Sequence, residues 1–201
     1  MRNNYLHFTF KKVMTKAGLL VTFLTLSCSY LSAQVTVTAT AGTTSGTYTT
    51  LKTAIDNINL GTHQGSIAIK VHTNTTETSG IVLVESGNVS GASYTGVSIA
   101  PADTATVTKT IAFAVSGATL LTLDNADNVT IDGRPLGLTT RKLLTFSHTS
   151  NTANSHTLVL QNGATNNVFA YTNFLNAATG TIAANNIRVL TGSNSTNNFN
   201  H

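Results

Sequence analysis

The 201-residue chain has a single cysteine, only two prolines, no tryptophan, and charged residues at 9% of its positions. One cysteine cannot form a disulfide within the chain, so stability must come from burial and backbone pairing. No acidic residue follows Asp132. Any site in the last third of the chain that needs a carboxylate of its own is therefore excluded.

Residues 1–33 have the pattern of a cleavable secretory signal. A basic leader contains Arg2, Lys11, Lys12 and Lys16. The apolar stretch Ala17–Leu26 is too short to span a bilayer, and Leu31-Ser32-Ala33 is a small-residue cleavage site, which predicts a cut near Gln34. An uncleaved anchor is the alternative. We predict a secreted or outer-cell-surface protein with no transmembrane segment in the mature chain, and Cys28 leaves with the signal.

Charge on the predicted mature chain is balanced. Removing the leader leaves seven basic and seven acidic residues, so the formal charge is zero. No basic patch or run of like charges remains, which argues against binding to nucleic acids or anionic membranes.

The remaining residues are rich in Thr, Asn, Ser, Gly and Ala. Disorder is one interpretation, but regular apolar segments argue against it. We expect a flexible or edge-strand N-terminus over 34–48 and one domain over 49–201.

One helix is predicted over residues 50–60. Thr49 or Thr50 can cap it, and Gly61 can end it. The apolar residues follow helical spacing: Leu51, Ala54, Ile55, Ile58 and Leu60.

Every later apolar segment is typical of a β-strand. These segments are 67–71, 81–84, 97–99, 111–115 and three strand–turn–strand units. The units pair 120–123 with 128–131, 158–160 with 167–169, and 187–190 with 198–199, with Asn in each turn. Aligning Val129, Val168 and Phe199 gives two steps of unequal length, so the repeat is loose and its loops vary.

Two all-β architectures fit these strands. A sandwich would join them by hairpins at short intervals. A right-handed single-stranded parallel β-helix would wind coils of about 20–25 residues, with Asn side chains bonding from coil to coil. We favour the β-helix, with the helix over 50–60 capping its N-terminal end. The side chains expected to point inward are Leu121, Leu123, Val129, Ile131, Leu158, Leu160 and Val168.

Two segments resemble known families. The run Thr47–Ile58 followed by Ile67–Val71 resembles the opening of pectinesterase-like and other pectate-lyase-type β-helices. Asn125–Arg134 resembles a rung of long secreted proteins of Gram-negative bacteria that use type IX export. This resemblance implies that the chain is an N-terminal fragment, incomplete at its C-terminus, and it specifies fold better than activity.

The only charged cluster is Asp124, Asp127, Asp132 and Arg134. Paired carboxylates can act as acid and base or hold Ca²⁺ in a lyase. The same residues are also turn formers that bond the local backbone, and we favour this structural role. Polygalacturonase and pectinesterase chemistry both need further acids in later coils, so we assign no catalytic residue.

Other candidate residues are scattered. Tyr94, Phe169 and Tyr171 could contact glycans if exposed, although packing inside the coil is the stronger interpretation. His63, His72, His148 and His156 lie too far apart in sequence for a metal motif. We expect no metal and no cofactor, with Ca²⁺ only in a lyase.

These observations favour a non-catalytic β-helix segment, adhesin-like or scaffold, whose partner is an extracellular polysaccharide or surface glycans. The alternative is the N-terminal part of a polysaccharide lyase or glycoside hydrolase whose active coils lie beyond His201.

Overall fold

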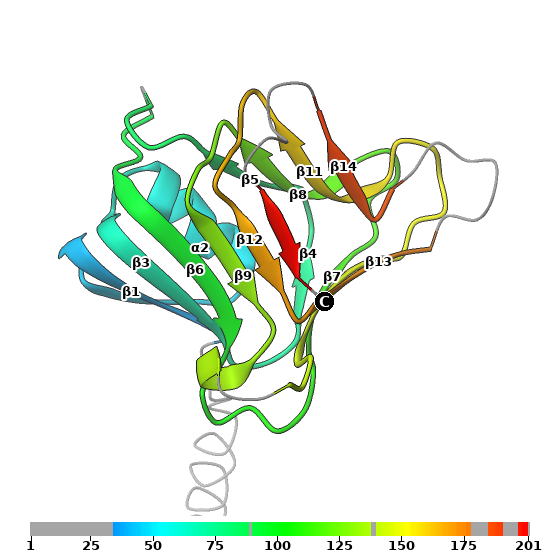
Figure 1. Ribbon diagram of the computed structural model, residues 1–201, viewed down its shortest axis with the longest axis horizontal. Coiled ribbons are helices and arrows are strands. Elements are labelled where there is room, and N and C mark those ends of the chain that lie inside the picture. Colours follow the sequence, from blue (N-terminus) through cyan, green and yellow to red (C-terminus); the bar gives the residue numbers. More distant parts are fainter. Residues whose placement is uncertain (1–33, 89, 138–139, 178–184, 191–196, 201) are drawn as a thin grey trace, which may run out of the picture. The chain divides into compact units, whose positions relative to one another are not determined.

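The computed structural model describes residues 34–88, 90–137, 140–177, 185–190 and 197–200. The predicted signal segment, 1–33, and residues 89, 138–139, 178–184, 191–196 and 201 of the predicted domain lie outside these ranges. The described strands form three sheets (Figure 1). The first sheet contains β15 (Asn198–Asn200), β12 (Val168–Ala170), β9 (Val129–Asp132), β6 (Tyr94–Pro101), β3 (His63–Val71), β1 (Val35–Gly42) and β2 (Ser45–Tyr48), in this order. The second contains β13 (Thr172–Asn176), β10 (Leu144–His148), β7 (Lys109–Phe113) and β4 (Thr75–Glu77). The third contains β14 (Ile187–Val189), β11 (His156–Gln161), β8 (Thr119–Asp124) and β5 (Ile81–Val84).

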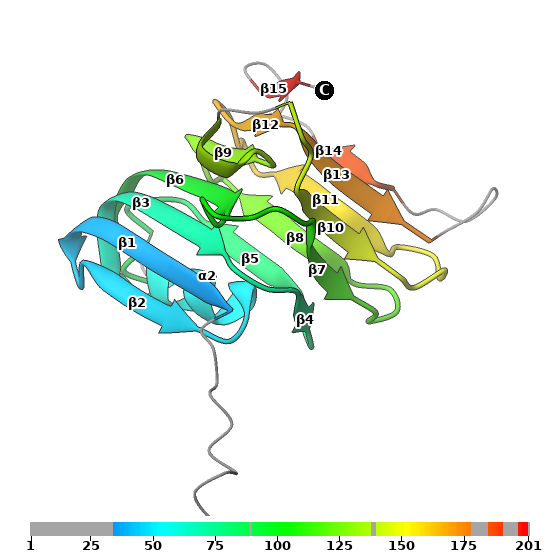
Figure 2. The same ribbon diagram turned by 90° about the horizontal axis from the view of Figure 1, so that it is seen from below.

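From β3 onward the chain visits the three sheets in a fixed rotation. β3 belongs to the first sheet, β4 to the second, β5 to the third, and β6 returns to the first; this order repeats to β15 (Figure 2). All described pairs among these strands are parallel, which confirms parallel strands over hairpin-paired sheets. A 3-10 turn, η1 (Pro135–Gly137), follows β9.

The coils are longer than the roughly 20–25 residues expected of a parallel β-helix. Ile67 pairs with Val97, and Ile131 pairs with Phe169. Both steps along the chain exceed the predicted coil length, and the second step is the longer of the two. Three strands of the second sheet, β4, β10 and β13, were not recognised from the sequence. Their sequences, TTE, LTFSH and TNFLN, lack the apolar runs that marked the other strands.

Residues 34–48 form the edge of the first sheet. β1 pairs with β2 on one side and with β3 on the other, both antiparallel. Val35 and Val37 are buried in the same core as β3, whereas β2 is the outermost strand. The sequence predicted either a flexible segment or an edge strand here, and the structure shows edge strands.

Helix α2 (Leu51–Asn59) confirms the predicted helix. Thr50 is the N-cap and forms a capping box with Thr53. Gly61 follows the C-cap with a φ of +71°, a conformation that glycine adopts at little cost. Leu60 was assigned to the apolar stripe, but it is 69% exposed; the buried face ends at Ile58.

Polar side chains join α2 to the first strands of the second and third sheets. The Glu77 carboxylate accepts hydrogen bonds from the backbone N–H of Leu51 and Lys52, both at 3.1 Å. Asn59 donates to the Val82 carbonyl at 2.7 Å and accepts from the Val84 N–H at 3.2 Å. The backbone of β5 is thus satisfied at the edge where no earlier strand pairs with it, and α2 covers this end of the stack.

The core consists of aligned apolar side chains, one from each coil. One row contains Ile81, Leu121, Leu158 and the partly buried Ile187; another contains Leu83, Leu123 and Leu160 and ends at Val189, which is 37% exposed. Burying each such side chain contributes roughly 1.5–3 kcal/mol. Six of the seven residues predicted to point inward are fully buried, the exception being Val168.

Val168 pairs with Thr130, whose side chain points outward, so its inward assignment was wrong. The core position of this strand belongs to Phe169, which pairs with Ile131 and Phe199. Aligning Val129 with Val168 shifted the register by one residue, and in a strand such a shift exchanges the two faces.

Candidate functional site

The turns that lead from the third sheet to the first carry most of the polar side chains discussed below. Asn125, Asn128, Asn162 and Asn166 have φ angles between 53° and 61° in these turns. Asparagine tolerates this left-handed conformation better than most residues, which explains its recurrence there.

Asp124 ends β8, Asp127 lies in the turn between β8 and β9, and both bond to the next coil. Asp124 accepts a hydrogen bond from the Asn162 side-chain amide. One oxygen of Asp127, Oδ1, accepts from the Thr165 N–H at 2.6 Å and from the Thr165 hydroxyl at 2.8 Å. Both carboxylates therefore connect equivalent turns of successive coils.

Asp132 and Arg134 lie at the opposite end of β9. Asp132 binds the Arg134 guanidinium through both carboxylate oxygens, with an Nη2–Oδ2 distance of 2.7 Å. This bonding to Asp132 raises the pKa of Arg134. The guanidinium lies 4.3 Å above the centre of the Tyr171 ring.

The charged cluster expected from sequence is thus divided between the two ends of one strand. Within the described ranges, no group of three or more His, Cys, Asp or Glu residues is arranged to hold a metal ion. Each of the three aspartates is bonded to a group of the chain itself, either in the next coil or at Arg134.

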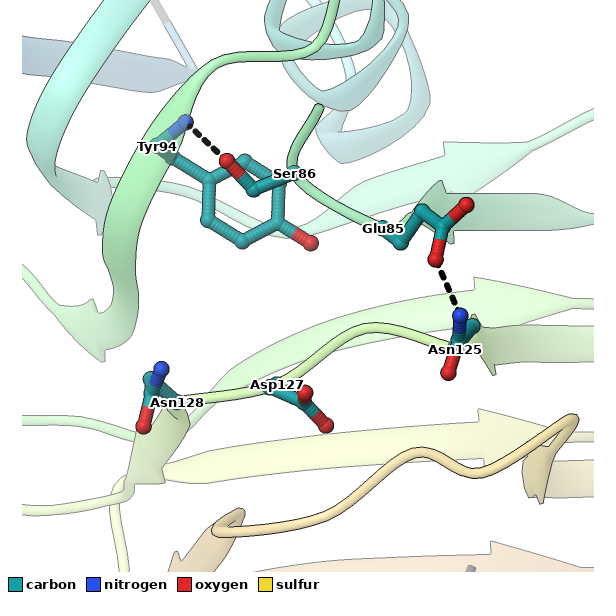
Figure 3. A pocket seen from close by; sticks show the side chains of 6 residues that line it. All are labelled: Glu85, Ser86, Tyr94, Asn125, Asp127 and Asn128. Atoms are coloured by element: carbon teal, nitrogen blue, oxygen red, sulfur yellow. Dashed lines mark hydrogen bonds between the residues drawn. The ribbon is translucent and has the colours of Figure 1, made fainter. Parts of the chain in front are cut away.

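A pocket of about 160 Å³ lies between the β5–β6 turn and the β8–β9 turn (Figure 3). Its lining consists of Glu85, Ser86, Tyr94, Asn125, Asp127 and Asn128. The structure therefore brings together Asp127, from the charged cluster, and Tyr94, from the aromatic candidates.

Tyr94 forms the wall of this pocket and is 6% exposed. Its hydroxyl donates to the Val84 carbonyl at 2.5 Å, and its backbone N–H donates to Ser86 Oγ at 2.8 Å. Burial raises the pKa of the phenol, and the negative charges of Asp127 and Glu85 raise this pKa further. The phenol therefore stays protonated and acts as a fixed donor to the backbone.

Glu85 lies on the other side of the pocket. Its Oε2 accepts a hydrogen bond from the side-chain amide of Asn125 (Figure 3). This bond links the turn of one coil to the turn of the next, as the Asp127–Thr165 bonds do one coil later.

The aromatic candidates do not form an exposed platform. Phe169 is 3% exposed and packs against Phe174 and Phe199, with ring centroids 5.9 and 4.9 Å away. Tyr171 is half-buried beneath Arg134. Tyr94 and Phe169 are buried, as the favoured interpretation of packing inside the coil expected, and their contact with glycans stays a prediction.

The histidines occupy separate structural positions. His63 is buried and bonds to the Tyr48 hydroxyl at 2.6 Å, while His72 bonds to Thr36 at 2.9 Å. Burial of the Tyr48 phenol raises its pKa.

His148 and His156 lie buried on neighbouring strands. His148 Nε2 is 2.9 Å from the Ala118 carbonyl, and its Nδ1 accepts from the Ser150 N–H at 3.2 Å. Burial lowers the pKa of both imidazoles, the Ala118 carbonyl opposes this for His148, and the positive charge of Arg188 lowers the pKa of His156 further.

Sequence reasoning missed Glu85, Ser86, Asn125 and Asn128 as lining residues. Asn125 and Asn128 were noted only as part of a turn. Their positions in the sequence could have indicated them, because Glu85 and Asn125 directly follow the apolar strands 81–84 and 119–124.

The chain matches no family model, no curated protein and no solved structure. The resemblance to pectate-lyase-type and pectinesterase-like proteins thus stays a prediction. None of the helices in the described part of the chain is long and apolar enough to cross a membrane.

Proposed function

We propose that this protein is a non-catalytic, secreted or cell-surface segment whose coils form a right-handed parallel β-helix. It serves as an adhesin-like or scaffold element that contacts glycans. The right hand is supported by the strong preference of crossovers between parallel strands for this hand. Export is supported by the leader pattern over residues 1–33.

The observation that carries the non-catalytic role is the bonding of the three candidate aspartates. Asp124 and Asp127 bond the next coil, and Asp132 bonds Arg134. A general acid or base needs a proton-exchanging oxygen directed at a substrate. Here Asp124 and one oxygen of Asp127 hold successive turns in register, and both oxygens of Asp132 are bonded to Arg134.

Glycan contact is supported by the outer face of the first sheet. Thr38, Ser98, Thr130 and Asn198 lie on this face at one register level, with Ala68 between the first two and Val168 between the last two. Only Ser98 and Thr130 lie on adjacent strands, at the strand spacing of about 4.8 Å, and the hydroxyl and amide groups of the row provide donors and acceptors for sugar hydroxyls.

The purified protein should bind insoluble polysaccharides in a sedimentation assay and release no soluble oligosaccharide from pectin or polyuronate, with or without Ca²⁺. Cleavage that is lost in Asp132→Ala would contradict the proposal and support the lyase alternative. In the native host, the extracellular protein should begin near Gln34 and be removed by protease treatment of intact cells. Retention inside the cells would contradict the surface location.

A further inference from the structure

The pocket between the β5–β6 and β8–β9 turns has hydrogen-bonding capacity that its own residues do not use. In the part of the chain that the structure describes, Asp127 accepts two hydrogen bonds, both through Oδ1, and Glu85 accepts one through Oε2. The second oxygen of each carboxylate is therefore available to a ligand. Figure 3 shows the Tyr94 hydroxyl pointing toward the space between these two side chains. This hydroxyl donates its proton to the Val84 carbonyl, so its oxygen can act only as an acceptor toward the pocket.

The acidic residues that line the pocket are not balanced by basic residues in the same lining. Two of the six lining residues are acidic and none is basic. The three ion pairs found in the described part of the chain use other acids: Asp56, Asp103 and Asp132. A partner with positive charge and several N–H donors would match this arrangement.

We propose that this pocket binds the protonated amine of an amino sugar, with Glu85 and Asp127 accepting hydrogen bonds from the ammonium group. The volume, about 160 Å³, is below the roughly 300 Å³ at which pockets for drug-sized ligands begin. It admits the ammonium group and part of one sugar ring. A primary ammonium offers three donors, which the two carboxylates and the Tyr94 oxygen can accept.

The rim distinguishes an amino sugar from a lysine side chain. Ser86 and Asn128 are exposed at the pocket and can bond the hydroxyl groups that flank a sugar amine. A lysine would bring an alkyl stem that needs apolar cover, and the lining has no aliphatic side chain. The inference rests on the proposed glycan-contacting role and names the sugar class for one site.

The test is a titration of the purified protein with D-glucosamine, D-glucose, N-acetyl-D-glucosamine, lysine amide and CaCl₂, followed by calorimetry and by amide NMR shifts. We expect glucosamine to bind at least about tenfold more tightly than glucose or the uncharged N-acetyl sugar, since each charge-assisted bond is worth about one such factor. The shifted amides should include those of Ser86, Tyr94 and Asn128.

Two substitutions locate the site. Glu85→Gln and Asp127→Asn should each weaken glucosamine binding about tenfold or more. Asp103→Asn, which changes an exposed acid outside the pocket lining, should leave it unchanged. If a variant fails to fold, the amide NMR shifts of the wild-type protein on addition of glucosamine locate the site by themselves.

Equal binding of glucose and glucosamine, shifts located elsewhere, or stronger binding of lysine amide or Ca²⁺ would each overturn the inference. Such results would leave the proposed function standing as long as the protein still sediments with neutral polysaccharides. Loss of all polysaccharide binding with glucosamine binding retained would instead remove the proposed function and keep the site.

Discussion

Asn167 and Asn197 make the same pair of hydrogen bonds one coil apart. The Asn167 side chain accepts from the Val129 N–H at 2.8 Å and donates to the Ala126 carbonyl at 3.0 Å. The Asn197 side chain accepts from the Asn167 N–H and donates to the Ala164 carbonyl, both at 3.0 Å. Each amide thus satisfies two backbone groups of the preceding turn, and Asn167 does so with no exposed surface.

Replacing Asn167 should destabilise the protein strongly. Asn167→Ala leaves a buried N–H and a buried carbonyl without partners, at a cost of about 2–4 kcal/mol in the free energy of unfolding. Denaturant titration followed by circular dichroism measures this change. Asn151→Ala, at an exposed loop position, is the matched control and should lie within about 0.5 kcal/mol of the wild type. Equal effects of the two variants would show that the amide bonds do not hold the turns.

Gly133→Ala should be at least as damaging. A Cβ at this buried position would lie 1.9 Å from the Tyr171 carbonyl oxygen, so the two coils would have to separate locally. We expect a loss of about 3 kcal/mol or more in unfolding free energy, because the obstacle is backbone that cannot rotate away. Gly87→Ala meets nothing within 4 Å but has a φ of +87°, so its cost of about 1 kcal/mol comes from backbone conformation. A smaller loss for Gly133→Ala than for Gly87→Ala would contradict the steric explanation.

Glu77→Ala should loosen the helix that covers the first coil. The buried carboxylate accepts from Leu51, Lys52 and the Thr75 hydroxyl. Its removal leaves the N–H groups of Leu51 and Lys52 without acceptors, which should lower the free energy of unfolding by about 2–4 kcal/mol. Hydrogen exchange should accelerate first in α2 and β5. Asp103→Ala removes an exposed ion pair with Lys70 and should cost at most about 1 kcal/mol. Unchanged protection of α2 in Glu77→Ala would refute the role of Glu77.

Stability should fall in mild acid. The pKa of His148 and of His156 is lowered in the folded chain, chiefly by burial. Between the unfolded value of about 6.5 and the lower folded value, the unfolded chain holds more protons, so stability is full above about pH 6.5 and is lost as the pH falls below it. The slope reaches at most about 1.4 kcal/mol per pH unit for each histidine. Urea titrations at pH 8 and pH 5 measure it. In His148→Gln the pH dependence should decrease; an unaltered slope would exclude His148.

Sequence patterns identified the strands whose faces alternate clearly. Leu121 and Leu123 alternate with Thr122 and Asp124, and this pattern gave both the strand and its inward face. β13, Thr172–Asn176, could not be recognised, because Phe174 alone packs against the core, and its apolar neighbour Leu175 is exposed instead of alternating with it. Its place follows from pairing with β10, which is information from a neighbouring strand rather than from its own sequence.

The candidate site was only half predictable. Asp127 and Tyr94 were both noted, but they were assigned to different roles because they lie far apart in the sequence. Their proximity depends on a register in which Val97 pairs with Val129. The loop lengths between strands conceal this register, and a one-residue error of the kind made at Val168 is enough to hide it.

The coils differ in length, whereas the pairing between their strands stays constant. Variation of the surface is therefore separated from maintenance of the framework, two tasks that most folds combine. Ile69–Ile99 and Ile131–Phe169 are equivalent pairs in one row, yet the second step along the chain is clearly longer than the first. The additional residues lie in the connections, so selection can lengthen or replace a connection without moving the ladder beneath it. A chain built in this way can diversify its surface as an antibody domain does, on a framework that stays the same.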